Sequence, residues 1–439
     1  MADLGCYRRH HRQPGAAACV SRTALPAAEW RKATGLVRVI AALADEHGGP
    51  RFVGGAVRDT LLGIAVSDVD LATALLPGAV IDRLQAAKIK AVPTGIAHGT
   101  VTAVAKGKNY EITTLRRDVA TDGRRATVAF SVDWREDAAR RDFTINALYA
   151  DPATGEIFDY FGGLEDLKNR AVRFIGNADE RIAEDHLRIL RYFRFLARFG
   201  NGTVNDEAIA ACTAAANKLL ALSRERIASE LLKLLALPDP RQAISLMVDH
   251  GIFAAFLPEL KGDAVHSVNR LVVRERANAI TPSLPTRILS LLPRDPGIVQ
   301  KVAMRLKLSN AMRADMVARA SVPTPSAQNI RAIAYREHVE CARDAAILFS
   351  DDADLSAALA ALRGWDIPEF PIKGGALVSR GLPVGPVVAE TLRAIEGQWI
   401  AESFPPLDRV NEIADQTVAL AIDVSRNENA AAFVNGRAK

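Results

Sequence analysis

The strongest constraint on the fold is a change in hydrophobic pattern at about residue 175. From residue 35 to 175, short β-rich runs alternate with helical patterns, whereas helical periodicity continues beyond Ile175 to the end of the chain. The 439 residues also exceed the roughly 250–300 residues that a single core supports. The sequence therefore predicts the α+β class, with a small mixed α/β head followed by an all-α remainder.

Local patterns divide the head into strands, turns and helices. A short strand enters a glycine turn at Gly54–Gly55, and Gly63 ends the helix that follows, because glycine readily adopts the left-handed conformation found after a helix. The polar stretch 117–135 is predicted to be a long functional or disordered loop. The other predictions are strands over 67–73, 99–106 and 109–116, the last two joined by a hairpin turn at Gly107–Lys108, and helices over 56–62 and 77–88.

Charge and composition restrict the partners only weakly. Lys plus Arg number 56 against 51 Asp plus Glu, which gives a net charge of +5. Hydrophobic residues make up 49% and charged residues 24%, as in globular rather than disordered chains. The balance is compatible with a polyanionic partner but does not require one.

Apolar run lengths argue against a membrane span, and cysteine spacing favours a reducing compartment. No run approaches the roughly 20 apolar residues needed to span a bilayer. We therefore expect no membrane association and a cytoplasmic location. The first 22 residues are basic with a single acid, so residues 1–30 are expected to form a disordered arm, with a transit peptide as the alternative. The cysteines are too dispersed for a zinc site or a disulfide framework: Cys6, Cys19, Cys212 and Cys341.

Two aspartates lie two residues apart in the predicted strand 67–73. Residues i and i+2 of a strand point to the same face, so Asp68 and Asp70 should lie side by side and could ligate two Mg²⁺ ions. Glu111, on a later predicted strand, is a candidate third carboxylate. Most Asp-x-Asp pairs are solvated strand faces, so the motif alone is weak support.

The glycine turn is a second candidate element of a nucleotide site. A strand that runs into Gly54–Gly55 and then a helix presents backbone N–H groups at a positive helix end, which suits phosphate oxygens. Arg58 could add a charge-assisted contact. The alternative is a structural turn with Arg58 on the surface. A glycine turn closely followed by a carboxylate pair is much more specific than either feature alone.

Three motifs in order resemble those of CCA-adding tRNA nucleotidyltransferases and bacterial poly(A) polymerases, which belong to the polymerase beta superfamily. The resemblance is strong over 51–199, moderate over 222–260 and faint over 370–386, where Gly375 and Ala376 depart from the expected polar residues. The motifs are GGAVRD (54–59) with Leu62–Gly63 and Asp68-Val-Asp70, RRDFTINAL (140–148) and EDHLRILRYFRF (184–195).

The resemblance implies a nucleotidyltransferase head followed by helical neck, body and tail regions. The expected boundaries are the arm over 1–30, the catalytic head over 31–175, a neck that selects the base over 176–255, the body over 256–345 and a tail that binds tRNA over 346–439. The implied activity is template-independent addition of C, C and A to the 3′ end of tRNA from CTP and ATP, with release of pyrophosphate.

Site residues carry over from the family where the motifs match. Asp68 and Asp70 match catalytic metal ligands, which implies Mg²⁺ as the cofactor. Gly55, Arg58 and Arg141 match nucleotide-binding positions. The third motif adds four positions that touch the incoming nucleotide: Asp185, Arg188, Arg191 and Arg194.

Hydrogen-bond inventories suggest how the third motif could choose a base. Placed on one helical face, Asp185 offers an acceptor beside the donors of Arg188. Cytosine and adenine complement this pair through an amino donor beside a ring nitrogen acceptor, whereas uracil and guanine reverse the order. The alternatives are an ordinary neck helix with a basic face, whose arginines would drift around the helix, and an ion pair between Asp185 and Arg188.

Two other functions are open at this point. Poly(A) polymerases of the family carry a glycine followed by basic residues and Phe after the metal pair, whereas residues 91–101 lack that signature. A catalytically silent RNA-binding relative is the third hypothesis, against which the intact acidic and basic motif residues argue. CCA addition, with the acceptor stem and 3′ end of tRNA as partner, is the prediction favoured by the motifs.

Overall fold

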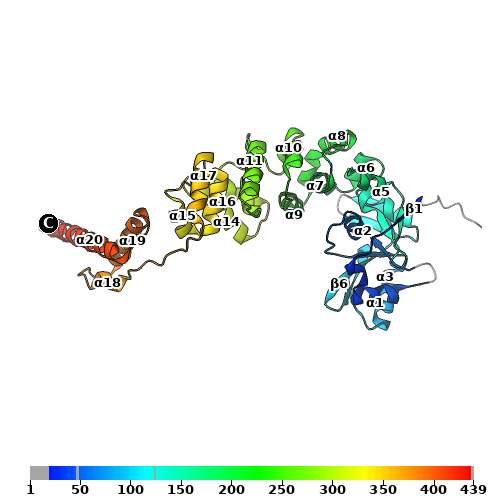
Figure 1. Cartoon of the computed structure of the whole chain (residues 1–439), viewed down its shortest axis with the longest axis horizontal. Coiled ribbons are helices and arrows are strands. Elements are labelled where there is room, and N and C mark those ends of the chain that lie inside the picture. Colours follow the sequence, from blue (N-terminus) through cyan, green and yellow to red (C-terminus); the bar gives the residue numbers. More distant parts are fainter. Residues whose placement is uncertain (1–18, 46–48, 123–124, 437–439) are drawn as a thin grey trace, which may run out of the picture. The chain divides into compact units, whose positions relative to one another are not determined.

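The structure is a computed structural model that describes residues 19–45, 49–122 and 125–436 (Figure 1). Contacts divide the chain into two compact units, the first ending at Pro258 and the second beginning at Glu259. Within the described ranges, every strand belongs to the first unit and the second unit is helical, as the hydrophobic pattern predicted. None of the described helices is both long and apolar enough to cross a membrane.

An eight-stranded mixed sheet organises the first unit. Its strand order is β1-β10-β9-β2-β3-β6-β5-β4, and β7 and β8 form a separate two-stranded sheet. The strands are β1 (Cys19–Ala24), β2 (Arg51–Val53), β3 (Asp70–Thr73), β4 (Lys90–Gly95), β5 (Thr100–Ala105), β6 (Lys108–Thr114), β7 (Arg116–Asp122), β8 (Arg125–Phe130), β9 (Leu148–Ala150) and β10 (Glu156–Asp159).

The register of three central strands brings the two predicted site elements to one edge of the sheet. β2 is antiparallel to β3, with Phe52 paired to Leu71. The end of β2, just before Gly54, therefore lies beside the start of β3 at Asp70. β3 is parallel to β6, and Asp70 is the direct partner of Glu111.

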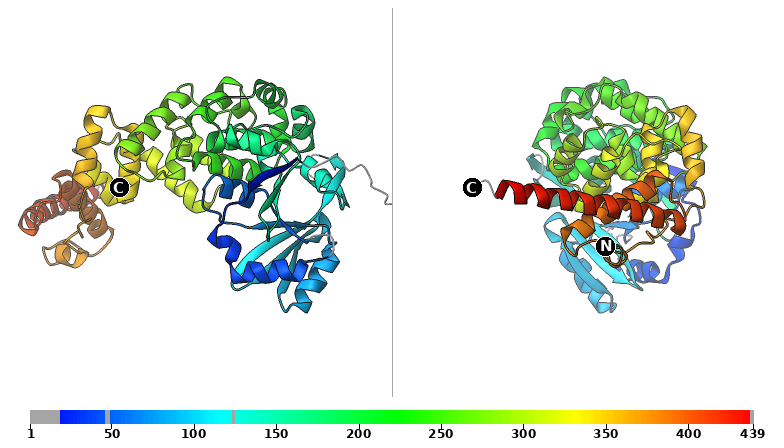
Figure 2. Two further views of the ribbon diagram at one scale, coloured as in Figure 1. Left: turned by 45° about the vertical axis from the view of Figure 1, so that its right-hand side comes forward. Right: turned by 90° about the vertical axis from the view of Figure 1, so that its left-hand side faces the viewer.

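Amphipathic helices cover one face of this sheet. The head is drawn in blue and cyan in Figure 2. Helix α1 buries Leu36, Val39 and Leu43, a helical spacing, and packs against α3 and β5. On the other face, α4 closes a second cluster that includes Val53 and Tyr149. The head helices are α1 (Thr34–Leu43), α2 (Gly55–Leu61), α3 (Pro77–Ala86), α4 (Trp134–Ala139) and α5 (Gly163–Lys168), with short 3-10 helices η1 (Glu29–Lys32), η2 (Ile96–His98) and η3 (Thr144–Asn146).

The hairpin between β5 and β6 is confirmed, and four details of the head differ from the predictions. The turn lies at Lys106–Gly107, one residue before the predicted Gly107–Lys108, and both residues have positive φ (51° and 75°), as in the tight turns that hairpins favour. The predicted loop 117–135 is wrong, because most of this polar stretch pairs as β7 and β8 and α4 follows. The predicted strand 67–73 begins only at Asp70, so Asp68 lies before it. Of the predicted arm, residues 1–18 lie outside the described part, whereas β1 pairs with β10, which differs from the disorder expected there.

Asp159 stabilises the turn between β10 and α5. Its carboxylate accepts hydrogen bonds from four successive backbone amides, those of residues 161–164, at 2.9–3.1 Å. We expect Asp159→Ala to lower the free energy of unfolding by about 2–4 kcal/mol, because these amides lose their acceptor in a buried turn. Denaturant unfolding measures the change. Asp151→Ala is the control, since Asp151 makes similar contacts at a more exposed turn, and an equal loss in the two variants would contradict the prediction.

Helices complete the first unit beyond the head. Helix α7 buries an apolar stripe that includes Ile189, Tyr192 and Phe193, and packs against α9 and α10. These elements are α6 (Ala178–Glu184), α7 (Leu187–Phe199), α8 (Asp206–Ala214), η4 (Ala216–Ala221), α9 (Arg224–Leu235), α10 (Arg241–Asp249) and η5 (Ile252–Ala255).

The second unit combines apolar clusters with buried ion pairs. Arg287, 1% exposed, forms a two-pronged contact with Glu275, and Arg319 pairs with the buried Asp344. A separate cluster around Trp399 joins the last helices. The helices are α11 (Ala264–Ala277), α12 (Leu284–Leu289), α13 (Pro296–Arg305), α14 (Asn310–Ser321), α15 (Ile330–Glu337), α16 (Val339–Phe349), α17 (Asp352–Leu362), α18 (Gly374–Val378), α19 (Pro386–Ala401) and α20 (Leu407–Gly436).

Candidate active site

Three exposed carboxylates gather at the edge of the sheet where β3 and β6 run side by side. Asp70 begins β3 next to Glu111, and Asp68 lies two residues earlier, where it accepts a hydrogen bond from Ser67 Oγ at 2.8 Å. The pKa of Asp70 is raised to about 6, first because surrounding protein atoms partly desolvate a carboxyl that water still reaches, and then because Glu111 lies nearby. The side chain of Arg141 opposes this shift.

The carboxylate edge suits a cation whose remaining coordination positions are filled by water and substrate. Within the described residues, no three His, Cys, Asp or Glu side chains form a ready-made metal cage. Mg²⁺ usually takes one or two protein carboxylates and fills its octahedron with water and substrate phosphates, so the donor set fits. Beside Asp68 opens a pocket of about 320 Å³ lined by residues of η1, the 66–69 segment and β6, including Trp30, Lys108 and Asn109.

The glycine turn has a backbone conformation that requires glycine. Gly54 has φ 66° and ψ −121°, which residues with a side chain rarely adopt. Its N–H donates to Leu148 O at 3.1 Å, which fixes the turn against β9. A Cβ on Gly54 would lie 3.6 Å from Arg141 Nη1, so the guanidinium of Arg141 rests against the turn.

Arg141 is held from behind by two buried side chains. Its Nη2 donates to Asp137 Oδ2 at 3.0 Å and its Nε donates to Tyr149 Oη at 3.2 Å. Asp137 is only 1% exposed. Although burial favours the protonated form, Arg141 and Arg140 bring the pKa of Asp137 down to about 2, so the carboxylate remains ionised.

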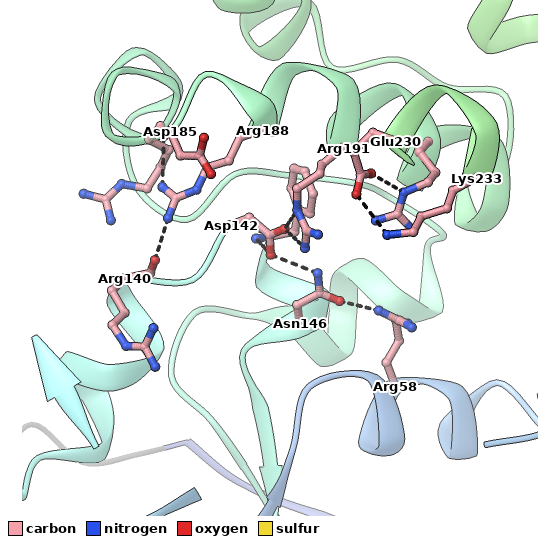
Figure 3. A network of polar contacts seen from close by, with 12 residues as sticks. Arg58, Arg140, Asp142, Asn146, Asp185, Arg188, Arg191, Glu230 and Lys233 are labelled. Atoms are coloured by element: carbon pink, nitrogen blue, oxygen red, sulfur yellow. Dashed lines mark hydrogen bonds and ion pairs between the residues drawn. The ribbon is translucent and has the colours of Figure 1, made fainter. Parts of the chain in front are cut away.

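Arg58 is buried and bridges the head to α7. Its Nη1 donates to Asn146 Oδ1 at 2.5 Å (Figure 3). Its Nε donates to Asp59 Oδ1 at 2.7 Å. The guanidinium also lies 4.2 Å from the ring centre of Phe199. The surface position that the sequence left open for Arg58 is wrong, because the side chain is buried. Its contacts in this structure are with protein groups.

The third motif is not one continuous helix. Asp185 is the extended residue that ends α6, and α7 starts at Leu187, so the expectation that Asp185 and Arg188 share one helical face is wrong. Asp185 accepts from Leu187 N at 3.1 Å and from Arg226 Nη2 at 2.6 Å. Arg188 instead pairs with Glu184 at 2.5 Å and donates to Arg140 O at 2.8 Å. Asp185 and Arg188 therefore pair with other residues, Arg226 and Glu184, rather than with each other as the alternative had it.

The remaining arginines of α7 reach carboxylates that the sequence interpretation did not assign. Arg191 donates to Asp142, which also accepts from Asn146 Nδ2 at 2.9 Å. Burial opposes ionisation of Asp142, but Arg191 and Asn146 hold its pKa below the usual value. Arg194 pairs with the buried Glu230 of α9 at 2.6 Å. Arg188, Arg191 and Arg194 follow one another at intervals of three residues, so they lie on one side of α7 rather than all around it.

Two families match parts of the chain, mostly within the first unit. Residues 50–173 match the family described as "Poly A polymerase head domain". Residues 203–263 match the one described as "Probable RNA and SrmB- binding site of polymerase A". The first match contains the carboxylate edge, the glycine turn and Arg141.

Whole-chain relatives identify the family. The mouse protein named CCA tRNA nucleotidyltransferase 1, mitochondrial, is 35% identical over 83% of this chain and 86% of its own length. A CCA-adding enzyme of Levilactobacillus brevis is 43% identical over 46% of this chain and 50% of its own. The solved structure of the Bacillus stearothermophilus CCA-adding enzyme with CTP shares the fold at a TM-score of 0.67 and 29% identity, over 90% of this chain and 98% of that one. This chain therefore belongs to the family of CCA-adding tRNA nucleotidyltransferases.

Proposed function

We propose that the protein adds C, C and A to the 3′ end of tRNA, using CTP and ATP and releasing pyrophosphate. The observation that carries the proposal is the shared sheet edge, where Asp70 and its neighbour Glu111 adjoin the Gly54 turn and Arg141. The family membership supplies the substrate class. The pocket beside Asp68 has room for part of the primer end, next to the carboxylates that would act on its 3′-hydroxyl.

We assign the metal site to Asp68 and Asp70. Two Mg²⁺ ions held there would lower the pKa of the primer hydroxyl and neutralise charge on the triphosphate. Gly55 and Arg141 would bind the triphosphate, because the turn brings backbone without a side chain next to a guanidinium. Arg58 would hold the turn in place through Asn146 and complete the nucleotide site.

The neck residues would bind the incoming base without a nucleic-acid template. Asp185, just after α6, would offer an acceptor and Arg188, in the first turn of α7, would offer donors, and cytosine and adenine complement this pair. Arg191 and Arg194 extend the nucleotide-binding surface along α7. Glu184 and Arg226 hold the two base-reading side chains before the nucleotide arrives, which reduces the entropy lost on binding.

We further propose the division into head (31–175), neck (176–255), body (256–345) and tail (346–439), with tRNA bound by the helical part. Support comes from the RNA-binding family match over 203–263. We also propose a reducing compartment, the cytoplasm, on the basis of the buried free thiols of Cys212 and Cys341.

Removing the second unit should weaken tRNA binding without weakening CTP binding. A chain cut after Pro258 retains the compact first unit with the glycine turn, the carboxylates and α7. We expect at least a tenfold loss of tRNA affinity, because phosphate contacts made by the second unit are lost while those of residues 203–258 remain, and a smaller dependence of that affinity on salt. Filter binding over a salt series and CTP titration measure both. Equal tRNA affinity in the two chains would assign RNA binding to the first unit.

The deciding experiment supplies purified protein with tRNA lacking its 3′ CCA, labelled CTP and ATP, and Mg²⁺. Ordered addition of C, C and A supports the proposal. Homopolymeric A would indicate a poly(A) polymerase, and incorporation of C alone or A alone would indicate a partial enzyme. No incorporation, with tRNA still bound, would indicate the catalytically silent relative.

A further inference from the structure

We infer that Asp137 and Tyr149 are positioning residues that aim Arg141 at the triphosphate, and that they set affinity for the nucleotide rather than for tRNA. The inference rests on the proposed role of Arg141 in the function above. Neither residue belongs to the metal pair or to the base-reading set.

The three side chains form a closed set of hydrogen bonds. Tyr149 Oη donates to Asp137 Oδ2 at 2.7 Å and accepts from Arg141 Nε at 3.2 Å. Asp137 Oδ2 also accepts from Arg141 Nη2 at 3.0 Å. Each contact uses the correct donor and acceptor, so Arg141 is gripped along one edge of its planar guanidinium.

The grip leaves the opposite corner of the guanidinium available. Among the residues that the structure describes, Arg141 Nη1 has no hydrogen-bond acceptor, and this is the nitrogen nearest to the Gly54 turn. A flexible arginine loses considerable rotamer entropy when it binds a ligand. Here that loss has already occurred on folding, because Asp137 and Tyr149 are 1% and 0% exposed and cannot exchange their contacts for water.

Asp137 and Tyr149 are themselves held in place by neighbouring side chains. Asp137 also accepts from Arg140 Nε at 2.8 Å, and the Tyr149 ring lies edge-on to Trp134 with centroids 5.4 Å apart. Removing the Asp137 carboxylate would therefore disturb the local fold as well as Arg141. Tyr149→Phe is the cleaner probe, since it keeps the buried ring and deletes only the hydroxyl that contacts Arg141.

Tyr149→Phe should weaken CTP binding about five- to tenfold, which lies within the range of the net contribution of one ordinary hydrogen bond. Binding of cytidine, which lacks phosphates, and of tRNA should be unchanged. The matched control is Tyr160→Phe, because the Tyr160 hydroxyl contacts an arginine outside the site, Arg51, at 3.3 Å in the same aromatic cluster. Thermal unfolding checks that both variants are equally folded.

A double-mutant cycle tests whether Tyr149 acts through Arg141. Arg141→Lys removes the guanidinium edge that Tyr149 holds, so adding Tyr149→Phe to it should cause no further loss of CTP affinity. Additive losses, an equal loss of cytidine or tRNA affinity, or unchanged CTP affinity in Tyr149→Phe would overturn the inference. CTP binding needs no turnover, so a wild-type protein that binds CTP but fails to extend tRNA would refute the proposed function and leave this test intact.

Discussion

Asp70→Ala is expected to lower the rate of CMP addition to tRNA by about a thousandfold or more, because metal-assisted charge stabilisation contributes several kcal/mol to catalysis. The side chain lies exposed at the start of β3, so its removal leaves the apolar core intact. Single-turnover addition of CMP to tRNA lacking CCA measures the effect, and tRNA binding should be nearly unchanged.

The matched control is Asp82→Ala, an exposed aspartate on α3 away from the carboxylate edge. It should retain the wild-type rate. A near wild-type rate in Asp70→Ala would remove the metal assignment, whereas a loss of folding in that variant, detected by thermal unfolding, would show that Asp70 contributes to structure.

The second large effect concerns base choice. Asp185→Asn should lower kcat/KM for CTP and ATP and narrow their lead over UTP and GTP by about ten- to a hundredfold. In the proposed base selection, wild-type Asp185 would oppose a carbonyl of uracil or guanine, and each buried group left unpaired costs roughly 1–3 kcal/mol. The amide of Asn replaces one acceptor by a donor and so relieves part of that mismatch.

Asparagine is preferable to alanine here because Asp185 also accepts from Leu187 N at the start of α7, and the side-chain oxygen of Asn can still accept that bond. The control Asp179→Asn changes an exposed acid in the first turn of α6. All four nucleotides are measured with each variant. An unchanged preference for C and A over U and G would refute selection by Asp185, even for an enzyme that still completes CCA.

Local sequence was sufficient to predict the parts of the site that are built from neighbouring residues. Gly54 and Asp70 could be placed together because a strand, a glycine turn and a second strand follow in sequence, and the parallel pairing then brought in Glu111. The polar stretch that forms β7 and β8 was predicted to be a loop, because most of it lacks the regular apolar alternation of a half-buried strand.

Partners distant in sequence could not be predicted in the same way. Glu230 meets Arg194 across 36 residues and Arg226 meets Asp185 across 41, through the packing of α9 on α7. Hydrophobic periodicity defines each helix but not which of its charged residues faces another helix. Spacing alone therefore suggested a local Asp185–Arg188 pair, where tertiary packing supplied a different partner for each residue.

The buried Arg287–Glu275 pair of the second unit restricts how this chain can diverge. Losing either partner alone leaves an uncompensated buried charge, at a cost of about 3–5 kcal/mol, against a total stability of roughly 5–15 kcal/mol for a typical domain. Replacing both by apolar residues of similar volume can be neutral. A change from the ionic pair to an apolar one in this chain therefore requires both substitutions nearly together, or additional stability gained elsewhere beforehand.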